Sequence, residues 1–396
     1  MRTQLVTALA SLTAIACGPT SGPTPNPATA GTSSTMATAA PEAPPTVPKP
    51  KPKPLGPSAY LIDAEGSVMV VGAHGATKLT QAALAEPAPV YLITNKSLRR
   101  IDQNGADLEA SVGITLAGVA TAADGSAYAY GNDGFMFRRA GAAWTPVASP
   151  MAARSGPIDL ALTAAGDAVA ISRYAVMAGR DGAFTPLEVL PAKALPTSVT
   201  VASDGTFYVA TEDKTVYRLV AGKANRVFKA PVRPSLIGAA ADGTLFVADA
   251  DDGIVVRDPK GALERFEIDG PDPLPGAPMD LAVDADGRAW VACRQGLAVL
   301  DHGALRTFPN HAAGNLRGTW KRIALSTVAP ALPPASEWSV VVGRVLRRGK
   351  PVAGATVTVT DVDHTMRRRG TTDSQGRFKV SGVPAMKIRR LPPSRP

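Results

Sequence analysis

A unit of about 40 residues recurs along the middle of this 396-residue chain. Its clearest copies start with D-G-T-F-Y-V-A at Asp204, D-G-T-L-F-V-A at Asp242 and D-G-R-A-W-V-A at Asp286. When the copies are aligned on the large residue of this apolar run, it falls at Tyr60, Tyr91, Tyr128, Val169, Tyr208, Phe246 and Trp290, with spacings of 31 to 44 residues. A glycine follows each of these positions 13 to 15 residues later. Because the large residue and the glycine recur together at a nearly constant separation, the sequence indicates seven copies of one structural repeat.

Each copy predicts four short antiparallel strands. The first, such as residues 279–283, ends at an Asp-Gly turn, where glycine adopts positive φ at little cost. The second, such as 289–292, is apolar and too short for a buried helix. A third strand reaches the second glycine, and a fourth carries an aromatic residue such as Phe308. One such sheet cannot bury its own faces, whereas a ring of them can. The chain is therefore predicted to be all-β, with a seven-bladed β-propeller over residues 58–328 and a six-bladed ring as the alternative.

The ring also needs a closing strand. The first copy begins at Ala59 without a first strand of its own, and a spare segment, W-K-R-I-A-L-S-T-V, follows the last copy at residues 320–328. This segment reads like the first strands I-D-L-A-L-T and M-D-L-A-V-D of other copies. We expect it to supply the innermost strand of the first blade.

The N-terminus has the features of a secretory signal. Residues 1–16 contain Arg2, an apolar stretch and a small residue before Cys17. The segment A-I-A-C resembles the lipobox of bacterial lipoproteins, although it has Ala14 where leucine is usual. The resemblance implies that Cys17 carries a lipid and that the protein is tethered to a membrane of the bacterial cell envelope, facing the periplasm or the cell surface. Ordinary signal cleavage with an incidental cysteine is the alternative.

Residues 17–57 predict a spacer between this anchor and the propeller. Positions 18–57 hold 12 prolines in 40 residues, a composition that favours an extended, disordered linker. Basic charge is concentrated toward the C-terminus. Residues 339–396 contain 13 basic and three acidic residues, whereas residues 58–338 contain 25 basic and 29 acidic residues. Secretion excludes nucleic acid as a partner, so anionic lipid or an envelope polymer suits the basic end better.

A second pattern follows a linker at residues 329–338. Alternating β-branched residues and the turns G-K-P-V-A-G and D-S-Q-G predict half-buried strands over 339–396. This region resembles the carboxypeptidase regulatory-like domain, a small β-sandwich with a carbohydrate-binding-like fold, which implies an accessory unit without catalytic residues. The family continues from G-V-P into a last strand, whereas this chain continues M-K-I-R-R-L-P-P-S-R-P. We therefore expect an incomplete sandwich with an irregular tail.

Residues for catalysis or metal binding are scarce. The four histidines, His74, His302, His311 and His364, show no metal-ligand spacing, and no nucleophile elbow or phosphate loop occurs. The acidic turns from Asp249 and Asp284 lack the further ligands of a calcium loop and predict hairpin turns. Cys293, at the end of an apolar strand, is expected to be a small buried filler. We expect no catalytic residue, no metal and no cofactor.

The propeller resembles NHL-type, two-component-regulator and streptogramin-lyase-like propellers. Only the last of these is enzymatic, and its catalytic pattern cannot be placed on this sequence. The leading hypothesis is a non-catalytic binding or scaffold module for a protein or an envelope polysaccharide. The alternatives are a lyase or hydrolase with its site in the central funnel, and carbohydrate binding through the sandwich. Any ligand is expected at the face formed by the loops 149–157, 190–196, 270–278, 211–214 and 249–253.

Overall fold

Every regular element in the described part of the chain is a β-strand, as the short apolar runs predicted. The computed structural model describes residues 57–63, 67–73, 75–79, 90–94, 97–102, 105–111, 115–122, 125–131, 134–141, 143–148, 158–268, 273–310, 316, 318–325, 329–333, 338–360 and 367–384. The signal, Cys17 and the proline-rich spacer lie outside these residues. Within them, no helix is long and apolar enough to cross a membrane.

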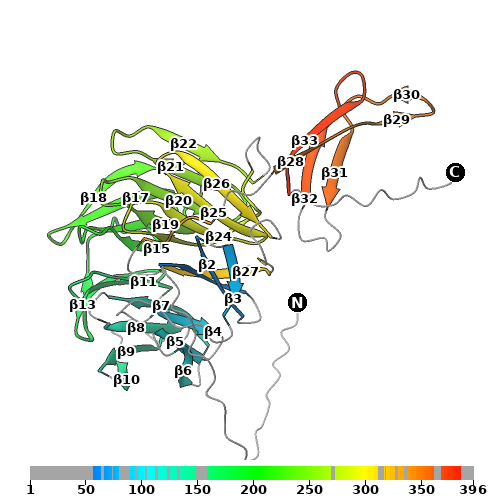
Figure 1. Cartoon of the computed structure of the whole chain (residues 1–396). Coiled ribbons are helices and arrows are strands. Elements are labelled where there is room, and N and C mark those ends of the chain that lie inside the picture. Colours follow the sequence, from blue (N-terminus) through cyan, green and yellow to red (C-terminus); the bar gives the residue numbers. More distant parts are fainter. Residues whose placement is uncertain are drawn as a thin grey trace, which may run out of the picture. The chain divides into compact units, whose positions relative to one another are not determined.

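Six four-stranded antiparallel sheets form blades of a β-propeller (Figure 1). The first combines β27 (Trp320–Leu325), β1 (Ala59–Asp63), β2 (Val68–Gly72) and β3 (Gly75–Lys78). The next two are β7 (Leu116–Thr121), β8 (Ala127–Gly131), β9 (Met136–Ala140) and β10 (Ala143–Val147), and β11 (Asp159–Leu162), β12 (Asp167–Ile171), β13 (Val176–Arg180) and β14 (Ala183–Leu187). The last three are β15 (Pro196–Val201), β16 (Phe207–Thr211), β17 (Thr215–Val220) and β18 (Lys223–Lys229); β19 (Leu236–Ala239), β20 (Leu245–Asp249), β21 (Gly253–Arg257) and β22 (Leu263–Phe266); and β23 (Pro278–Val283), β24 (Ala289–Cys293), β25 (Gly296–Asp301) and β26 (Ala304–Pro309).

A three-stranded sheet lies between the first two of these blades. It consists of β4 (Val90–Thr94), β5 (Ser97–Asp102) and β6 (Gly105–Ser111), and β4 contacts both β27 and β7. The first strands of the other blades contact one another in the order β7, β11, β15, β19, β23 and β27. The sheets therefore follow one another around a ring.

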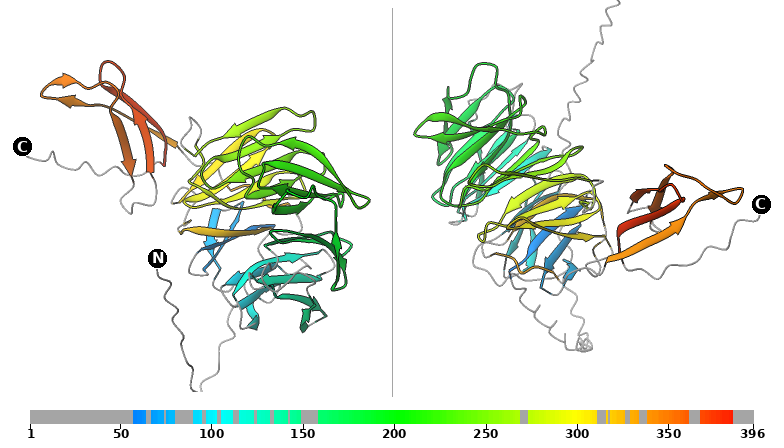
Figure 2. Two further views of the ribbon diagram at one scale, coloured as in Figure 1. Left: turned by 180° about the vertical axis from the view of Figure 1, so that it is seen from behind. Right: turned by 90° about the horizontal axis from the view of Figure 1, so that it is seen from above.

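The strand at the end of the propeller sequence closes this ring, as predicted. β27 pairs antiparallel with β1, with Leu61 opposite Ile323 and Tyr60 opposite Ala324, and the two lie side by side in Figures 1 and 2. The fully buried Trp320 anchors β27, because its indole N–H donates to Asn310 Oδ1 at 3.0 Å. Residues from both ends of the propeller sequence thus share one core cluster, which includes Leu61, Trp290 and Trp320.

Residue size explains how neighbouring sheets fit together. The large landmark residue of each second strand lies opposite a small residue of the first strand, as in Tyr128 with Ala120, Val169 with Ala161, Tyr208 with Thr200, Phe246 with Gly238 and Trp290 with Ala282. At Gly238 a Cβ atom would lie 2.3 Å from Leu281 Cδ2 of the next blade, so only glycine is accommodated. The repeat therefore alternates large and small side chains in the way that close packing between sheets requires.

The segment after the propeller differs from the expected linker in part. Residues 329–333 lie against the propeller, where Arg288 Nη2 donates to the carbonyl of Pro330 at 2.9 Å and Leu332 packs on the first core cluster. The region beyond contains β28 (Trp338–Arg344) paired with β33 (Arg377–Pro384), β29 (Leu346–Arg347) with β30 (Lys350–Pro351), and β31 (Thr356–Thr360) with β32 (Arg367–Thr371). Val341, Val359 and Phe378 surround the buried Val380. These paired strands agree with the predicted β-structure, and the sandwich itself stays a prediction.

Candidate functional site

A cavity of about 750 Å³ lies among the first strands of the blades, at the centre of the ring. We call it the central channel. Apolar residues such as Ile93, Leu162 and Val283 form much of its wall, together with small residues of the turns that follow the first strands. Four of its polar residues, Tyr130, Asp159, Asp280 and Arg322, lie on β8, β11, β23 and β27. The wall of the channel therefore exposes polar and apolar surface in nearly equal measure, and its polar groups come from different blades.

Asp159 connects its blade to the next one. Its Oδ2 accepts hydrogen bonds from the Ser198 hydroxyl at 2.8 Å and the Val199 backbone N–H at 2.9 Å, both on β15. Its Oδ1 accepts from the Leu160 N–H at 2.9 Å and from the Tyr130 hydroxyl at 3.1 Å. Burial raises the pKa of Asp159, and the hydrogen bonds from Val199 and Ser198 oppose that rise. Both carboxyl oxygens are thus occupied by donors of the fold.

Asp280 repeats this arrangement at another blade. Its Oδ1 accepts from the Leu281 N–H and its Oδ2 from the Ile323 N–H of β27, each at 3.0 Å. Burial raises its pKa as well, while the charge of Arg322 acts in the opposite direction. Asp159 pairs with Ile171 and Asp280 with Ala292, each two positions from the landmark residue of the second strand. The two aspartates therefore occupy the same register position and make the same connection between blades.

Tyr130 and Arg322 complete this polar layer. Tyr130 reaches Asp159 over Gly118, where an added Cβ atom would lie 2.0 Å from the tyrosine hydroxyl oxygen. Burial, followed by the charge of Asp159, raises the pKa of Tyr130 well above its ordinary value, so the phenol stays protonated and donates. The exposed Arg322 donates one hydrogen bond through Nη2, to the carbonyl of Ala117 on β7. Its other N–H groups make no further hydrogen bond within the described structure.

The described wall of the channel contains no histidine, cysteine or lysine. Its two inner carboxylates, Asp159 and Asp280, accept backbone N–H groups, and the Ser198 hydroxyl donates to Asp159 Oδ2. No group of three or more His, Cys, Asp or Glu side chains that would suit a metal ion occurs among the residues the structure describes. The two carboxylates hold neighbouring blades together.

The predicted binding loops do not form this site. Of the loops that the structure describes, Leu190–Pro196, Thr211–Lys214 and Asp249–Gly253 do not line the channel. Loop 149–157 and residues 270–272 lie outside the described residues, as do His74, His311 and His364. The wall of the channel comes instead from strands and from the turns after them, and ligand binding at the loop face stays a prediction.

Two smaller predictions are confirmed. The carboxyl group of Asp249 accepts the N–H groups of Asp251 and Asp252, and that of Asp284 accepts those of Asp286 and Arg288, so both acidic segments are hairpin turns. Cys293 is fully buried.

Sequence reasoning missed the four polar channel residues. The available signal was a charged residue inside otherwise apolar first strands, as in I-D-L-A-L-T and M-D-L-A-V-D.

No protein-family model and no curated protein matches this chain. Solved structures do match it. They include a streptogramin B lyase (TM-score 0.49, 11% identity, 82% of this chain and 98% of that chain) and virginiamycin B lyase from Staphylococcus aureus (0.48, 13%, 83% and 95%). The WD40 β-propeller domain of Doa1 is also similar (0.47, 11%, 83% and 97%). These proteins differ in function, and their likeness to this chain carries no information about its ligand or activity.

Proposed function

We propose that this protein is a membrane-tethered lipoprotein of the bacterial envelope whose propeller binds a ligand in the central channel without transforming it. The observation that carries the proposal is the channel itself, a cavity of about 750 Å³ whose wall combines apolar side chains with polar groups from several blades. Cavities of about 300–1,000 Å³ are typical of small-molecule sites. A protruding part of a larger partner, such as a protein loop or a polysaccharide end, would fit the same space.

The wall of the channel supports a binding role. Strands form most of it, and Asp159 and Asp280 connect successive strands through backbone N–H groups. Such a wall needs little reordering when a ligand arrives, so less conformational entropy is lost on binding. Arg322, which uses one of its five N–H groups, is the side chain best suited to hold an acceptor group of the ligand.

We further infer that the three-stranded sheet is the remainder of a seventh blade. Tyr91 on β4 makes an edge-to-face contact with Trp144 of β10, with ring centroids 5.7 Å apart. Tyr128 makes the same contact with Phe184 of β14, also at 5.7 Å. The Tyr128–Phe184 pair joins the second strand of one blade to the fourth strand of the next blade. By analogy, β4, which carries Tyr91, is the second strand of its blade. The first strand of this blade would fall within residues 80–89, outside the described residues.

The tether and the C-terminal region keep the roles that their sequences predict. Cys17 would carry the lipid, residues 18–57 would hold the propeller away from the membrane, and the carboxypeptidase regulatory-like region would be an accessory unit. Attachment through several acyl chains is stable, since each buried CH₂ contributes about 0.8 kcal/mol. The ligand would then be an envelope protein or polysaccharide, and nucleic acid is not a partner.

An affinity capture from envelope extracts tests the binding role. Ala164 lies in an exposed turn and lines the channel, so Ala164→Trp should obstruct the channel with little effect on folding. Ala183→Trp, at an exposed position of β14, is the matched control. We expect a molecule that wild type and Ala183→Trp retain and Ala164→Trp loses. Equal retention by all three proteins would contradict binding in the channel, and a chemically altered product would favour the lyase or hydrolase alternative.

A further inference from the structure

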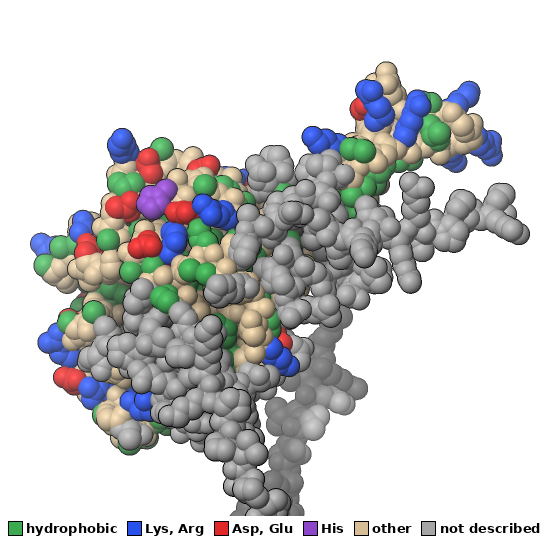
Figure 3. All heavy atoms as spheres, in the orientation of Figure 1, with side chains coloured by type: hydrophobic (Ala, Val, Ile, Leu, Met, Phe, Trp, Pro, Cys, Tyr) green, Lys and Arg blue, Asp and Glu red, His purple; other side chains and the backbone are tan. Residues whose placement is uncertain are grey.

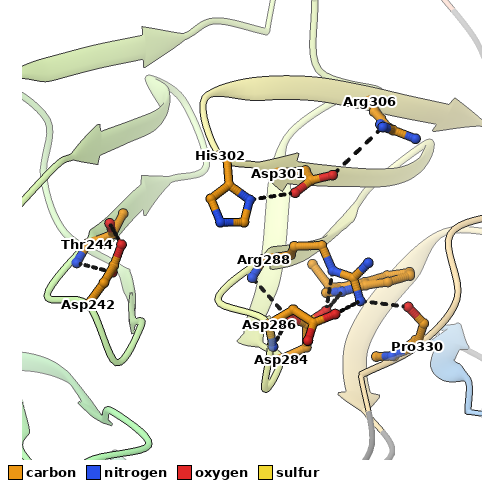
Figure 4. Close-up of polar contacts among 10 residues, drawn as sticks. Asp242, Thr244, Asp284, Asp286, Arg288, Asp301, His302, Arg306 and Pro330 are labelled. Atoms are coloured by element: carbon orange, nitrogen blue, oxygen red, sulfur yellow. Dashed lines mark hydrogen bonds and ion pairs between the residues drawn. The ribbon is translucent and has the colours of Figure 1, made fainter.

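A second hollow, of about 550 Å³, lies between the blades β19–β22 and β23–β26. We call it the lateral groove. Phe246, Val256 and Leu300, which belong to a buried apolar cluster, line its interior, and Leu263 on β22 is 51% exposed. The groove shares only Ala240 and Ala285 with the wall of the central channel and lies at the turns beside His302 (Figure 4). Its apolar interior is therefore open to an occupant of its own.

Carboxylates surround this apolar interior. Asp242, Asp258, Glu264 and Asp286 line the groove, and none of the described residues lining it is a lysine or arginine. Only Asp286 has an ion pair, with Arg288 Nη2 at 3.1 Å. Asp242 accepts the N–H of Thr244 and Asp258 that of Ala262, contacts that leave their charges unneutralised. Figure 3 shows acidic side chains around a histidine on this face.

Arg288, Arg306 and His302, which lie near the groove, are already engaged. Arg288 is held by Asp284 at 2.8 Å and by Asp286, and Arg306 faces Asp301 at 3.8 Å (Figure 4). His302 Nδ1 lies 2.9 Å from Asp301 Oδ1. The carboxylates of Asp242, Asp258 and Glu264 thus remain without an ion pair within the described structure, and the groove calls for a cationic occupant with apolar side chains.

We propose that the lateral groove docks the chain's own basic segment, residues 385–396. This segment, A-M-K-I-R-R-L-P-P-S-R-P, follows β33, lies outside the described residues and has four basic residues and no acidic one. Its apolar Ile388 and Leu391 flank Arg389 and Arg390, so apolar side chains can fill the groove while guanidinium groups reach the surrounding carboxylates. Twelve extended residues span up to about 40 Å, and covalent linkage raises the effective concentration of the segment.

A labelled peptide of residues 385–396 tests this docking on full-length protein. In the chain with Lys387→Glu, Arg389→Glu and Arg390→Glu the groove should be vacant, so this variant should bind the peptide saturably. The wild-type chain should bind it at least tenfold more weakly, because its own segment competes. Binding should also weaken as salt rises, since the opposed charges are exposed. Equal affinity of the two chains, or no binding by the variant, would overturn the proposal.

Groove variants locate the interaction. Asp242→Asn, Asp258→Asn and Glu264→Gln, combined in the charge-reversed chain, remove three carboxylates but keep an oxygen that can accept the turn hydrogen bonds. We expect at least a tenfold loss of peptide affinity, whereas Asp251→Asn, at an exposed turn outside the groove, should bind as before. An unchanged thermal transition verifies that each variant is folded. Undiminished binding by the triple groove variant would place the segment elsewhere and refute the docking, and selective capture of anionic vesicles by the wild-type segment would do the same.

Discussion

Asp159 and Asp280 show how single residues serve both the ring and its channel. Each places one carboxyl oxygen on a backbone N–H of its own strand and the other on a backbone N–H of the next blade. Such an N–H is an obligatory donor, and a buried donor without an acceptor is costly. The charged wall of the channel is thus also a set of connections between blades.

We predict that Asp159→Asn destabilises the protein although it removes a charge. The amide would present an NH₂ group to one of two backbone donors, Leu160 N–H or Val199 N–H. The unsatisfied donor should lower the free energy of unfolding by about 1–3 kcal/mol. Urea denaturation measures this loss, and Ser198→Ala, which removes only one hydroxyl donor, should lose less. A more stable Asp159→Asn variant would contradict the assigned connection.

The raised pKa of Asp159 gives this effect a pH dependence. Because the folded state binds the proton more tightly than the unfolded state, the contribution of Asp159 to stability is full below its ordinary pKa of 3.8. It decreases as the pH rises through the raised value. The difference in unfolding free energy between wild type and Asp159→Asn should therefore be largest in acid and shrink toward neutral pH. A difference that grows with pH would show that burial does not dominate this pKa.

Among the elements, β27 is the one on which the closure of the ring depends. It completes the first blade with a strand from the far end of the propeller sequence, and it receives the connection from Asp280 through the Ile323 N–H. Its first residue, Trp320, is fully buried in the cluster shared by the first and last blades. Closure is therefore a matter of packing as well as of strand pairing.

Trp320→Ala should open this closure. Loss of a fully buried indole costs about 3–5 kcal/mol, and the variant should also lose the single sharp unfolding transition. Asn310→Ala, which removes the acceptor of the indole N–H and the hydrogen bond that Asn310 Nδ2 donates to the Gly318 carbonyl, is the milder comparison, at about 2 kcal/mol. Calorimetry checks both variants. A Trp320→Ala protein with an unchanged transition would mean that the ring does not depend on β27.

The three-stranded sheet leads to a prediction about residues 80–89. If β4, β5 and β6 are the second to fourth strands of a seventh blade, this segment supplies the first strand, and its amides should exchange slowly with solvent. Hydrogen exchange measured by mass spectrometry can compare peptides from 80–89 with peptides from β23, which has the equivalent position. Exchange as fast as that of an unstructured peptide would leave a six-bladed ring with an extra sheet.

How much of this architecture was predictable depended on the range of the interactions. The segment 320–328 was recognised as a closing strand because its pattern repeats that of other first strands. The role of Asp159 was not, because its partners Ser198 and Val199 belong to another blade, and the register between blades is set by packing. The four polar residues of the channel were missed for a related reason. Which groups surround the cavity depends on how closely the first strands approach one another around the ring.

At the scale of the whole molecule, we propose a lipid anchor and a spacer before the ring and its channel, with a basic C-terminal region after them. The anchor is the part that is most simply tested. We predict that Cys17 is the first residue of the mature protein and carries acyl chains, so Cys17→Ser should release the protein from the membrane fraction. Intact mass and fractionation of cells expressing each form check this. A mature wild-type protein that starts elsewhere, without lipid, would show ordinary signal cleavage.

Native mass spectrometry of the protein after exposure to envelope extract can show whether a molecule binds in the channel and stays chemically unaltered. We expect wild type and Ala183→Trp to carry an adduct whose mass equals that of the same molecule in untreated extract, and Ala164→Trp to carry none. An adduct on Ala164→Trp, or a bound or released molecule whose mass has changed during incubation with wild type, would show that the proposed binding role is wrong.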